Sequence, residues 1–207
     1  MLRLVTGGSG SGKSRYAEDL ILSFGPRKRY YIATMMPWDG ECRRRIERHR
    51  RMRAEKGFET VEQYLDLETL SLEPGAAVLL ECLSNLAANE YFRETRPDSS
   101  SDAGLSWKSQ VETRLAEGIF RLETQAAELV VVTNEIFSDG VAYDGETMNY
   151  MEVLGRTNAR LAARAGQVTE VVYGIPIHHR LPETGAPLLS GGGKNAGNPT
   201  KKEEQVL

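Results

Sequence analysis

A glycine-rich segment at the start of the chain has the residue types and spacing of a phosphate-binding loop. Residues 7–14 read GGSGSGKS and fit the pattern G-x-x-x-x-G-K-[ST]. Glycines let the backbone turn its N–H groups inward, where they and the positive end of a following helix can cradle phosphates. Lys13 would reach the β- and γ-phosphates as a catalytic cation, and the Ser14 hydroxyl would hold Mg²⁺. The segment predicts nucleoside triphosphate binding by Gly7, Gly8, Ser9, Gly10, Ser11, Gly12, Lys13 and Ser14.

Two acids at the ends of apolar runs are candidates for ordering the metal ion. Glu81 closes the run AAVLLE, where a P-loop protein needs a carboxylate near Mg²⁺ or its waters. Glu135 follows the run LVVVT and is its rival, either for the ion or to polarise a substrate hydroxyl. We expect Ser14 and Glu81 to be the metal ligands, because a P-loop already implies the ion.

A histidine in a strongly basic segment is a candidate nucleophile. His49 lies four residues from both Arg45 and Arg53, in a stretch over residues 41–56 that reads as a helix. The surrounding cations disfavour the imidazolium, so His49 is expected to stay neutral near pH 7. A neutral imidazole beside bound phosphate can attack phosphorus and form a covalent intermediate. A surface histidine on a solvated helix and a helix that binds nucleic acid are the alternatives, although no aromatic residues are interleaved for base stacking.

The order of apolar and amphipathic segments predicts how these residues are brought together. Strands are expected at 2–5, 30–34, 58–61, 76–81, 129–133 and 168–173, and helices at 15–22, 41–56, 84–93, 107–127 and 146–165, with a polar loop at 97–104. Continuously apolar strands between helices predict an α/β fold with a mostly parallel sheet covered on both faces. Ligands of such sheets bind at the carboxyl ends of the strands, so the loops after Val5, Thr34, Glu81, Thr133 and Tyr173 should surround one site.

Length and composition limit the remaining possibilities. The chain has 207 residues, enough for one α/β domain, expected over residues 1–180, followed by a disordered tail at 190–207. The formal net charge of −3 favours neither nucleic acid nor an acidic membrane as a partner. Two cysteines without CxxC spacing indicate reduced thiols and a cytoplasmic protein. No apolar run has membrane-spanning length, and the first strand leaves no room for a cleaved signal.

Several segments, taken in order between residues 2 and 176, resemble one enzyme family. TGGSGSGKSRYAE, YIAT, RIERHRRMR, VLLECLSNL, VVVTNE and GRTNARLA are similar to the bifunctional adenosylcobinamide kinase / adenosylcobinamide-phosphate guanylyltransferase family. The resemblance implies a P-loop NTPase of RecA-like fold that assembles as a homotrimer. It also implies two reactions: phosphorylation of the adenosylcobinamide hydroxyl by ATP or GTP, and transfer of GMP from GTP to that phosphate.

The resemblance also assigns roles to individual residues. By motif position, His49 would attack the α-phosphorus of GTP and carry the guanylyl group. Further nucleotide contacts are expected from Thr34, Arg45, Glu62 and Glu81. Mg²⁺ would be the cofactor, and adenosylcobinamide, ATP and GTP the substrates, with no nucleic acid and no membrane span involved.

The sequence departs from the family pattern in three places. Residues 150–152 read Tyr-Met-Glu where Phe-Arg-Asp is usual, so an arginine is missing, and Arg156 is a candidate to compensate. Tyr143 replaces a common proline, and Phe58 stands where a tryptophan is common. Three alternatives therefore stay open: a guanylyltransferase with lost or weakened kinase activity, a generic P-loop kinase of small metabolites, and a nucleotide-dependent binding module.

Overall fold

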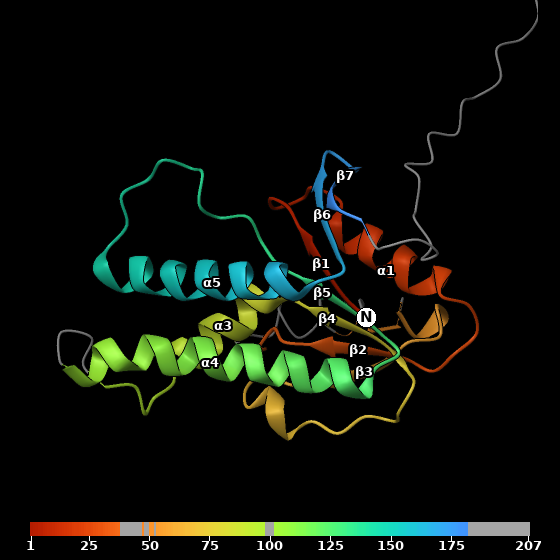
Figure 1. The fold of residues 1–207 in the computed structure, drawn as a ribbon, viewed down its shortest axis with the longest axis horizontal. Helices are drawn as coiled ribbons and strands as arrows, with labels where there is room; N and C mark the ends of the chain where they lie inside the picture. Colours follow the sequence, from red (N-terminus) through yellow and green to blue (C-terminus); the bar gives the residue numbers. More distant parts are fainter. Residues whose placement is uncertain (38–46, 48–49, 52, 98–101, 182–207) are drawn as a thin grey trace, which may run out of the picture.

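A seven-stranded sheet forms the centre of the computed structural model, which describes residues 1–37, 47, 50–51, 53–97 and 102–181. The strands are β1 (Leu2–Thr6), β2 (Arg29–Ala33), β3 (Glu59–Glu62), β4 (Ala77–Glu81), β5 (Glu128–Val132), β6 (Gln167–Val172) and β7 (Ile175–Arg180). Their spatial order is β3-β2-β4-β5-β1-β6-β7, and only the β6–β7 pair is antiparallel. The predicted α/β fold with a mostly parallel sheet is therefore confirmed (Figure 1).

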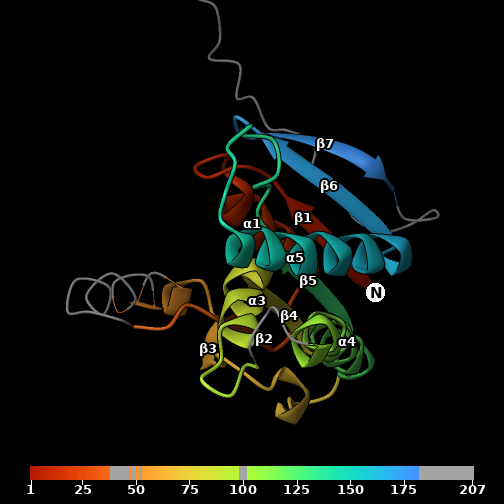
Figure 2. The same ribbon diagram turned by 90° about the vertical axis from the view of Figure 1, so that its left-hand side faces the viewer.

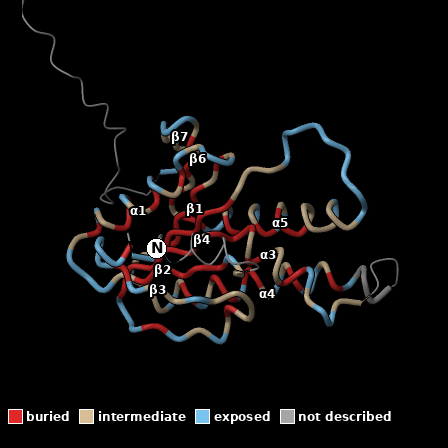
Figure 3. The backbone as a smooth tube through the Cα atoms, turned by 180° about the vertical axis from the view of Figure 1, so that it is seen from behind, coloured by how far each residue is buried: buried red, intermediate tan, exposed pale blue. Residues whose placement is uncertain are grey.

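Helices cover both faces of the sheet, because successive strand side chains point to opposite sides. On β4, Val78 and Leu80 join the core beneath α3 (Leu83–Tyr91), α4 (Asp102–Gln125) and α5 (Gly145–Arg164). Ala77 and Leu79 join a second core beneath α1 (Lys13–Ser23). Figure 3 shows buried backbone concentrated in the central strands, as expected for strands covered on both faces.

The strand β7 was not predicted, so the expectation that the chain's last strand is residues 168–173 is wrong. β6 turns at Tyr173 and Gly174, with φ values of 51° and 80°, and returns as β7 along the sheet edge. Two consecutive positive φ values suit a tight hairpin turn, but a tyrosine gives little turn signal. The polar residues His178, His179 and Arg180 further hid the strand. Figure 2 shows this hairpin at the opposite edge of the sheet from β3.

Other boundaries differ from expectation by a few residues. α4 begins at Asp102, so the polar loop expected to run to residue 104 ends earlier. α5 begins where Asp144 accepts a hydrogen bond from the Thr147 N–H at 3.0 Å, an N-cap that the sequence analysis had not used. Of the basic segment at 41–56, residues 47, 50, 51 and 53–55 are helical, and most of the others lie outside the described residues, as does the tail expected at 190–207. Among the helices described, none is long and apolar enough to cross a membrane.

Candidate functional site

The glycine-rich loop joins β1 to α1, as its motif requires. Gly12 caps α1 with φ 92° and contributes no side-chain hydrogen bond, so the first N–H groups of the helix remain available to an anion. A Cβ at Gly12 would lie 3.3 Å from the Gly174 Cα, and one at Gly7 would lie 2.5 Å from the Val171 carbonyl oxygen. The Gly174 N–H also donates to the Ser11 carbonyl at 2.8 Å. The β6–β7 turn therefore supports one side of the loop and excludes larger residues from it.

Lys13 lies folded over this loop. Its side chain is largely buried, and its Nζ donates to the Gly8 carbonyl at 3.0 Å. Ser9 and Gly10 are exposed at the tip of the loop. The Lys13 ammonium would thus exchange one carbonyl contact for phosphate oxygens when a nucleotide enters.

Ser14 and Glu81, 67 residues apart in the chain, are in direct contact. The Ser14 hydroxyl donates to Glu81 Oε1. Glu81 Oε2 is buried and accepts no hydrogen bond of regular geometry from the described residues, although the Tyr31 phenol interacts with the same carboxylate. A buried carboxylate oxygen without a regular hydrogen bond is costly, and it fits a position whose normal partner is a cation or a cation-bound water.

These two side chains fit the predicted Mg²⁺ site by their chemistry. Mg²⁺ prefers oxygen ligands, keeps several waters and uses one or two carboxylates together with substrate phosphates. In the described part of the chain, no three His, Cys, Asp or Glu side chains gather into a cluster that would bind a metal alone. A site of one carboxylate and one hydroxyl would need further oxygen ligands, such as nucleotide phosphates and waters.

Tyr31 and Arg53 pack against each other close to Glu81. Burial, followed by the negative charge of Glu81, raises the pKa of Tyr31 well above its usual value, so the phenol stays neutral. The Arg53 guanidinium stacks on the Tyr31 ring, 3.6 Å from its centroid, and is largely buried. The carboxyl-terminal end of the basic segment is thereby attached close to Glu81, the acid predicted to order the metal ion.

Thr34 holds the chain that follows Glu81. Its hydroxyl accepts from the Cys82 N–H and donates to the Cys82 carbonyl, both at 2.8 Å, and its own N–H donates to the Glu81 carbonyl at 3.2 Å. Thr34 is 0 % exposed. Its expected nucleotide contact stays a prediction, and the arrangement shows Thr34 instead fastening the end of β4.

The ends of β4 and β5 are joined by a polar contact that the sequence analysis missed. Asn134 Nδ2 donates to Ser84 Oγ at 2.6 Å, and Ser84 Oγ lies 3.0 Å from Cys82 Sγ. Burial raises the pKa of the Cys82 thiol above its usual value. Tyr150, one of the residues that depart from the family pattern, donates its hydroxyl to the Ser84 carbonyl at 3.2 Å. In the sequence, the one signal for a site role of Ser84 and Asn134 is that each residue lies shortly after an apolar run.

The rival acid Glu135 is already satisfied by its own loop. Its carboxylate accepts from the Phe137 N–H at 2.9 Å and from the Ser138 hydroxyl at 2.8 Å, while its N–H donates to the Gly7 carbonyl at 3.1 Å. It therefore braces the phosphate loop. Glu62 lies exposed at the carboxyl end of β3, two strands from Glu81, and accepts from the Tyr64 hydroxyl at 2.8 Å.

Arg45 and His49 lie outside the described residues, so their roles stay predictions. Arg156, the candidate to compensate for the missing family arginine, lies exposed on α5 and pairs with Glu152 at 2.5 Å. Lys108 donates to the same carboxylate at 2.6 Å, and this contact lowers the pKa of Glu152. Lys108 and Arg156 are thus both paired with Glu152, which lies in the triplet 150–152 that differs from the family pattern.

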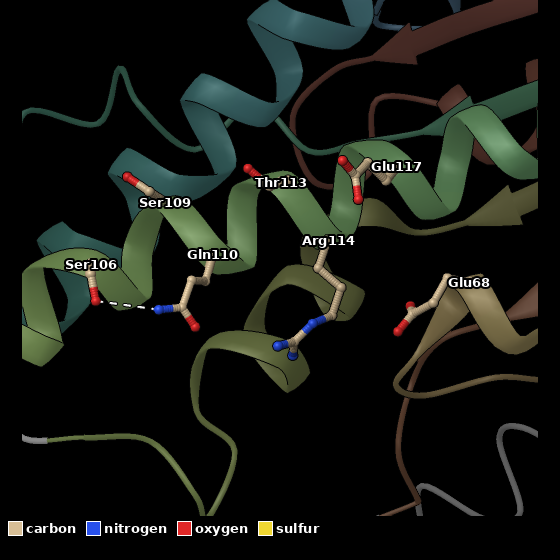
Figure 4. A pocket seen from close by; sticks show the side chains of 7 residues that line it. All are labelled: Glu68, Ser106, Ser109, Gln110, Thr113, Arg114 and Glu117. Atoms are coloured by element: carbon tan, nitrogen blue, oxygen red, sulfur yellow. Dashed lines mark hydrogen bonds between the residues drawn. The ribbon is translucent and has the colours of Figure 1, made fainter.

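The described surface includes two hollows, one beside α3 and one along α4. One, of about 630 Å³, opens beside α3 at the carboxyl end of β2. The other, of about 680 Å³, runs along α4 opposite η1 (Leu67–Thr69) and is lined by polar side chains, with Gln110 donating to Ser106 at 3.3 Å (Figure 4). Met35 and Met36, which follow β2, line the first hollow together with residues of α3, whereas the second contains none of the loops at the strand ends. Neither of these two hollows is lined by residues 7–14 or by Glu81.

Solved structures that resemble this chain include two with low TM-scores and low sequence identity. A flagellar accessory protein FlaH from Methanocaldococcus jannaschii aligns with a TM-score of 0.44 and 9 % identity, covering 87 % of this chain and 78 % of its own. A type III secretion system ATPase of pathogenic bacteria aligns with a TM-score of 0.43 and 10 % identity, covering 82 % and 50 %. The fold assignment therefore rests on the sheet topology itself.

Comparisons at the level of sequence are far closer. The bifunctional adenosylcobalamin biosynthesis protein CobU of Escherichia coli is 35 % identical, over 86 % of this chain and 98 % of its own. The protein of the same name from Salmonella typhimurium is 36 % identical over the same shares, and CobP of Pseudomonas aeruginosa is 30 % identical over 91 % and 100 %. Residues 3–179 match the family described as cobinamide kinase / cobinamide phosphate guanyltransferase. The chain belongs to this family of cobalamin biosynthesis enzymes, as its motif series predicted.

Proposed function

We propose that this chain phosphorylates the hydroxyl of adenosylcobinamide with ATP or GTP, and then transfers GMP from GTP to the new phosphate. The observation that carries the proposal is the contact between Ser14 and Glu81, because it joins the phosphate loop to an acid whose second oxygen is buried and lacks a regular hydrogen bond within the described part of the chain. The family match supplies the substrate class.

In the kinase step the chain's own residues bind and orient the nucleotide. The N–H groups at the start of α1 and the Lys13 ammonium hold the β- and γ-phosphates. Ser14 and Glu81 would hold Mg²⁺, which neutralises the charge that develops on the transferred phosphoryl group. The acceptor oxygen attacks the γ-phosphorus, and the bond from that phosphorus to the bridging oxygen breaks.

In the guanylyl step we assign the nucleophile to His49. One imidazole nitrogen attacks the α-phosphorus of GTP, pyrophosphate leaves, and a phosphorus–nitrogen bond forms. The cobinamide phosphate oxygen then attacks the same phosphorus and breaks that bond, giving adenosylcobinamide-GDP. The stacking of Arg53 on Tyr31 supports this role, since Arg53 is four residues from His49 and is held near Glu81. Arg45 and Glu62 are proposed to add nucleotide contacts.

Two product measurements test the two steps separately. Purified protein with Mg²⁺, ATP and adenosylcobinamide should form ADP and adenosylcobinamide-phosphate, and a Lys13→Ala variant should lose this activity. With GTP and chemically prepared adenosylcobinamide-phosphate, the wild type should release pyrophosphate, and His49→Ala should not. Failure of both reactions in the wild type would refute the proposal.

The departure at residues 150–152 favours one second candidate, a guanylyltransferase with weakened kinase activity. Glu152 pairs with both Lys108 and Arg156, so either cation would have to leave this carboxylate to replace the missing arginine at a phosphate. Pyrophosphate release in the guanylyl reaction, with no ADP formation in the kinase reaction, would favour this second candidate.

The assembly and surroundings of the protein are part of the same proposal. We propose a single domain over residues 1–180, a homotrimer, Mg²⁺ as cofactor and a cytoplasmic location. Exposed apolar side chains on the β6–β7 hairpin, namely Tyr173, Ile175 and Ile177, support an interface between copies. Light scattering should give about three times the chain mass of 23.0 kDa.

A further inference from the structure

The hollow beside α3 has the size and lining of a ligand pocket. Its volume of about 630 Å³ lies within the range of small-molecule sites. Its apolar wall consists of Met35, Met36, Leu65, Ala88 and Phe92. Met35 and Phe92 are 38 % and 46 % exposed, so this wall presents apolar surface that a ligand could cover. Methionine side chains adapt their shape to a bound apolar surface.

Two carboxamides, together with Arg93, Glu94 and Thr95, supply the polar part of this pocket. The Asn85 carboxamide has no hydrogen-bond partner in the part of the chain that the structure describes, although it lines the hollow. Asn89 Nδ2 donates to the Thr34 carbonyl at 2.8 Å and to the Tyr64 carbonyl at 2.9 Å. Asn89 therefore fixes the wall between the ends of β2 and β3, while Asn85 is available to a ligand.

The pocket adjoins the acid that marks the metal end of the phosphate site. Asn85 follows Glu81 by four residues in the first turn of α3. Asn89 binds the carbonyl of Thr34, whose N–H binds the carbonyl of Glu81. The pocket and the acid are therefore connected by two successive hydrogen-bonded contacts.

The pocket also lies on the acceptor side of the nucleotide. In the sheet order, β2 and β3 lie on one side of β4, whereas β1 and the β6–β7 hairpin, whose Gly174 supports the phosphate loop, lie on the other. Ser14 and Glu81 would hold the metal ion, which would stabilise charge at the phosphate end of the nucleotide. An acceptor that attacks the γ-phosphorus in line must approach from beyond this metal end, away from the rest of the nucleotide.

We propose that this pocket receives an edge of the corrin ring of the cobinamide acceptor, a conclusion that rests on the proposed function. A corrin ring is largely apolar and carries carboxamide side chains on its rim. The apolar wall would cover the ring edge, and the Asn85 carboxamide would pair with a rim amide, as both groups donate and accept. The pocket thereby positions the acceptor hydroxyl relative to the γ-phosphorus.

Two pocket variants and one control test this assignment. Ala88→Trp fills the hollow, and Asn85→Ala removes an amide that has no internal partner. Ala163→Trp adds the same bulk at an exposed position on α5. For each variant we would measure KM and kcat of the kinase reaction for adenosylcobinamide and for ATP, and the melting temperature. Binding of the coloured corrinoid would be followed by its absorbance in the absence of nucleotide.

The assignment predicts a selective loss of corrinoid binding. Ala88→Trp should raise the KM for adenosylcobinamide by about 10-fold or more, and Asn85→Ala by about 3- to 10-fold, the worth of one hydrogen bond. The KM for ATP, the melting temperature of Asn85→Ala and all properties of Ala163→Trp should stay at wild-type values.

Contrary outcomes distinguish this inference from the proposed function. Unchanged corrinoid KM in Ala88→Trp and Asn85→Ala, with an active wild type, would overturn the pocket assignment and leave the function intact. A raised KM for ATP alone would overturn it in favour of a nucleobase site. A wild type with no cobinamide-dependent activity and no corrinoid binding would overturn both.

Discussion

Replacing Glu81 by glutamine separates the two functions of its carboxylate. Glutamine keeps the side-chain shape and an oxygen that can accept from the Ser14 hydroxyl. It removes the negative charge and places an amide where the buried Oε2 lies. If that oxygen serves Mg²⁺, the variant should fold normally and fail specifically in the metal-dependent state.

The expected size of the effect follows from the surroundings of Oε2. Without metal, exchanging a buried charged oxygen for a neutral group should leave the free energy of unfolding unchanged or raise it by about 1 kcal/mol. Losing one metal-orienting group typically weakens metal affinity by about 10- to 100-fold. A metal–nucleotide complex present at 100 times its Kd stabilises the protein by about 2.7 kcal/mol, whereas after a 100-fold weakening it adds only about 0.4 kcal/mol.

Thermal unfolding with and without Mg²⁺ and a non-hydrolysable nucleotide is the appropriate assay. For a chain of this size, the wild-type melting temperature should rise by about 5–11 °C, and that of Glu81→Gln by about 1–2 °C. Glu135→Gln is the matched control, because Glu135 also follows a strand but is satisfied by Phe137 and Ser138. Its metal-dependent shift should equal that of the wild type. A full shift in Glu81→Gln together with a lost shift in Glu135→Gln would refute the assignment and favour the rival acid.

Three further predictions concern the loop, the core and the thiol. Gly12→Ala, at φ 92° and against Gly174, should weaken fluorescent nucleotide binding by about 10-fold or more, because a Cβ strains the cradle by about 1–2 kcal/mol. Glu90, only 1 % exposed, accepts from Arg93 and Arg114, so Glu90→Ala should lower the free energy of unfolding in urea by about 3–5 kcal/mol. The raised pKa of Cys82 predicts slow alkylation at neutral pH, with a rate that still increases above pH 9, in a variant whose other cysteine is serine.

Each of these three predictions has a clear contrary result. Wild-type nucleotide affinity in Gly12→Ala would show that the loop tolerates a side chain there. A loss below about 1 kcal/mol for Glu90→Ala would show that its ion pairs contribute no more than exposed ones. Rapid alkylation of Cys82 at pH 7 would contradict both its burial and its raised pKa.

Much of the fold was predictable because its signals are local. The apolar runs ending at Val5 and Glu81 are strands covered on both faces, and their burial makes them continuous in the sequence. β7 was missed because its polar residues and its Tyr173–Gly174 turn carry no strong pattern. Its existence depends on pairing with β6, which is a tertiary interaction.

The site was predictable where one motif fixes both residue type and position. Lys13 and Ser14 follow from the phosphate-loop pattern, and Glu81 from its place at a strand end. The buried Oε2 of Glu81 and the internal satisfaction of Glu135 could not be read from the sequence, because both depend on side-chain geometry. The bridge that Asn89 makes between two strand ends depends on the packing of α3 and has no local signal.

Labelling with GTP tests the covalent guanylyl-histidine most directly. Wild type, His49→Ala and the control His179→Ala would be incubated with Mg²⁺ and GTP labelled at the α-phosphorus, and then separated by denaturing electrophoresis. His179 is the suitable control because it pairs with Glu170 on the β6–β7 hairpin, at 3.1 Å. The proposed mechanism predicts acid-labile, alkali-stable label on the wild type and His179→Ala, and none on His49→Ala. Equal labelling of His49→Ala, or no label on a wild type that binds the nucleotide, would contradict it.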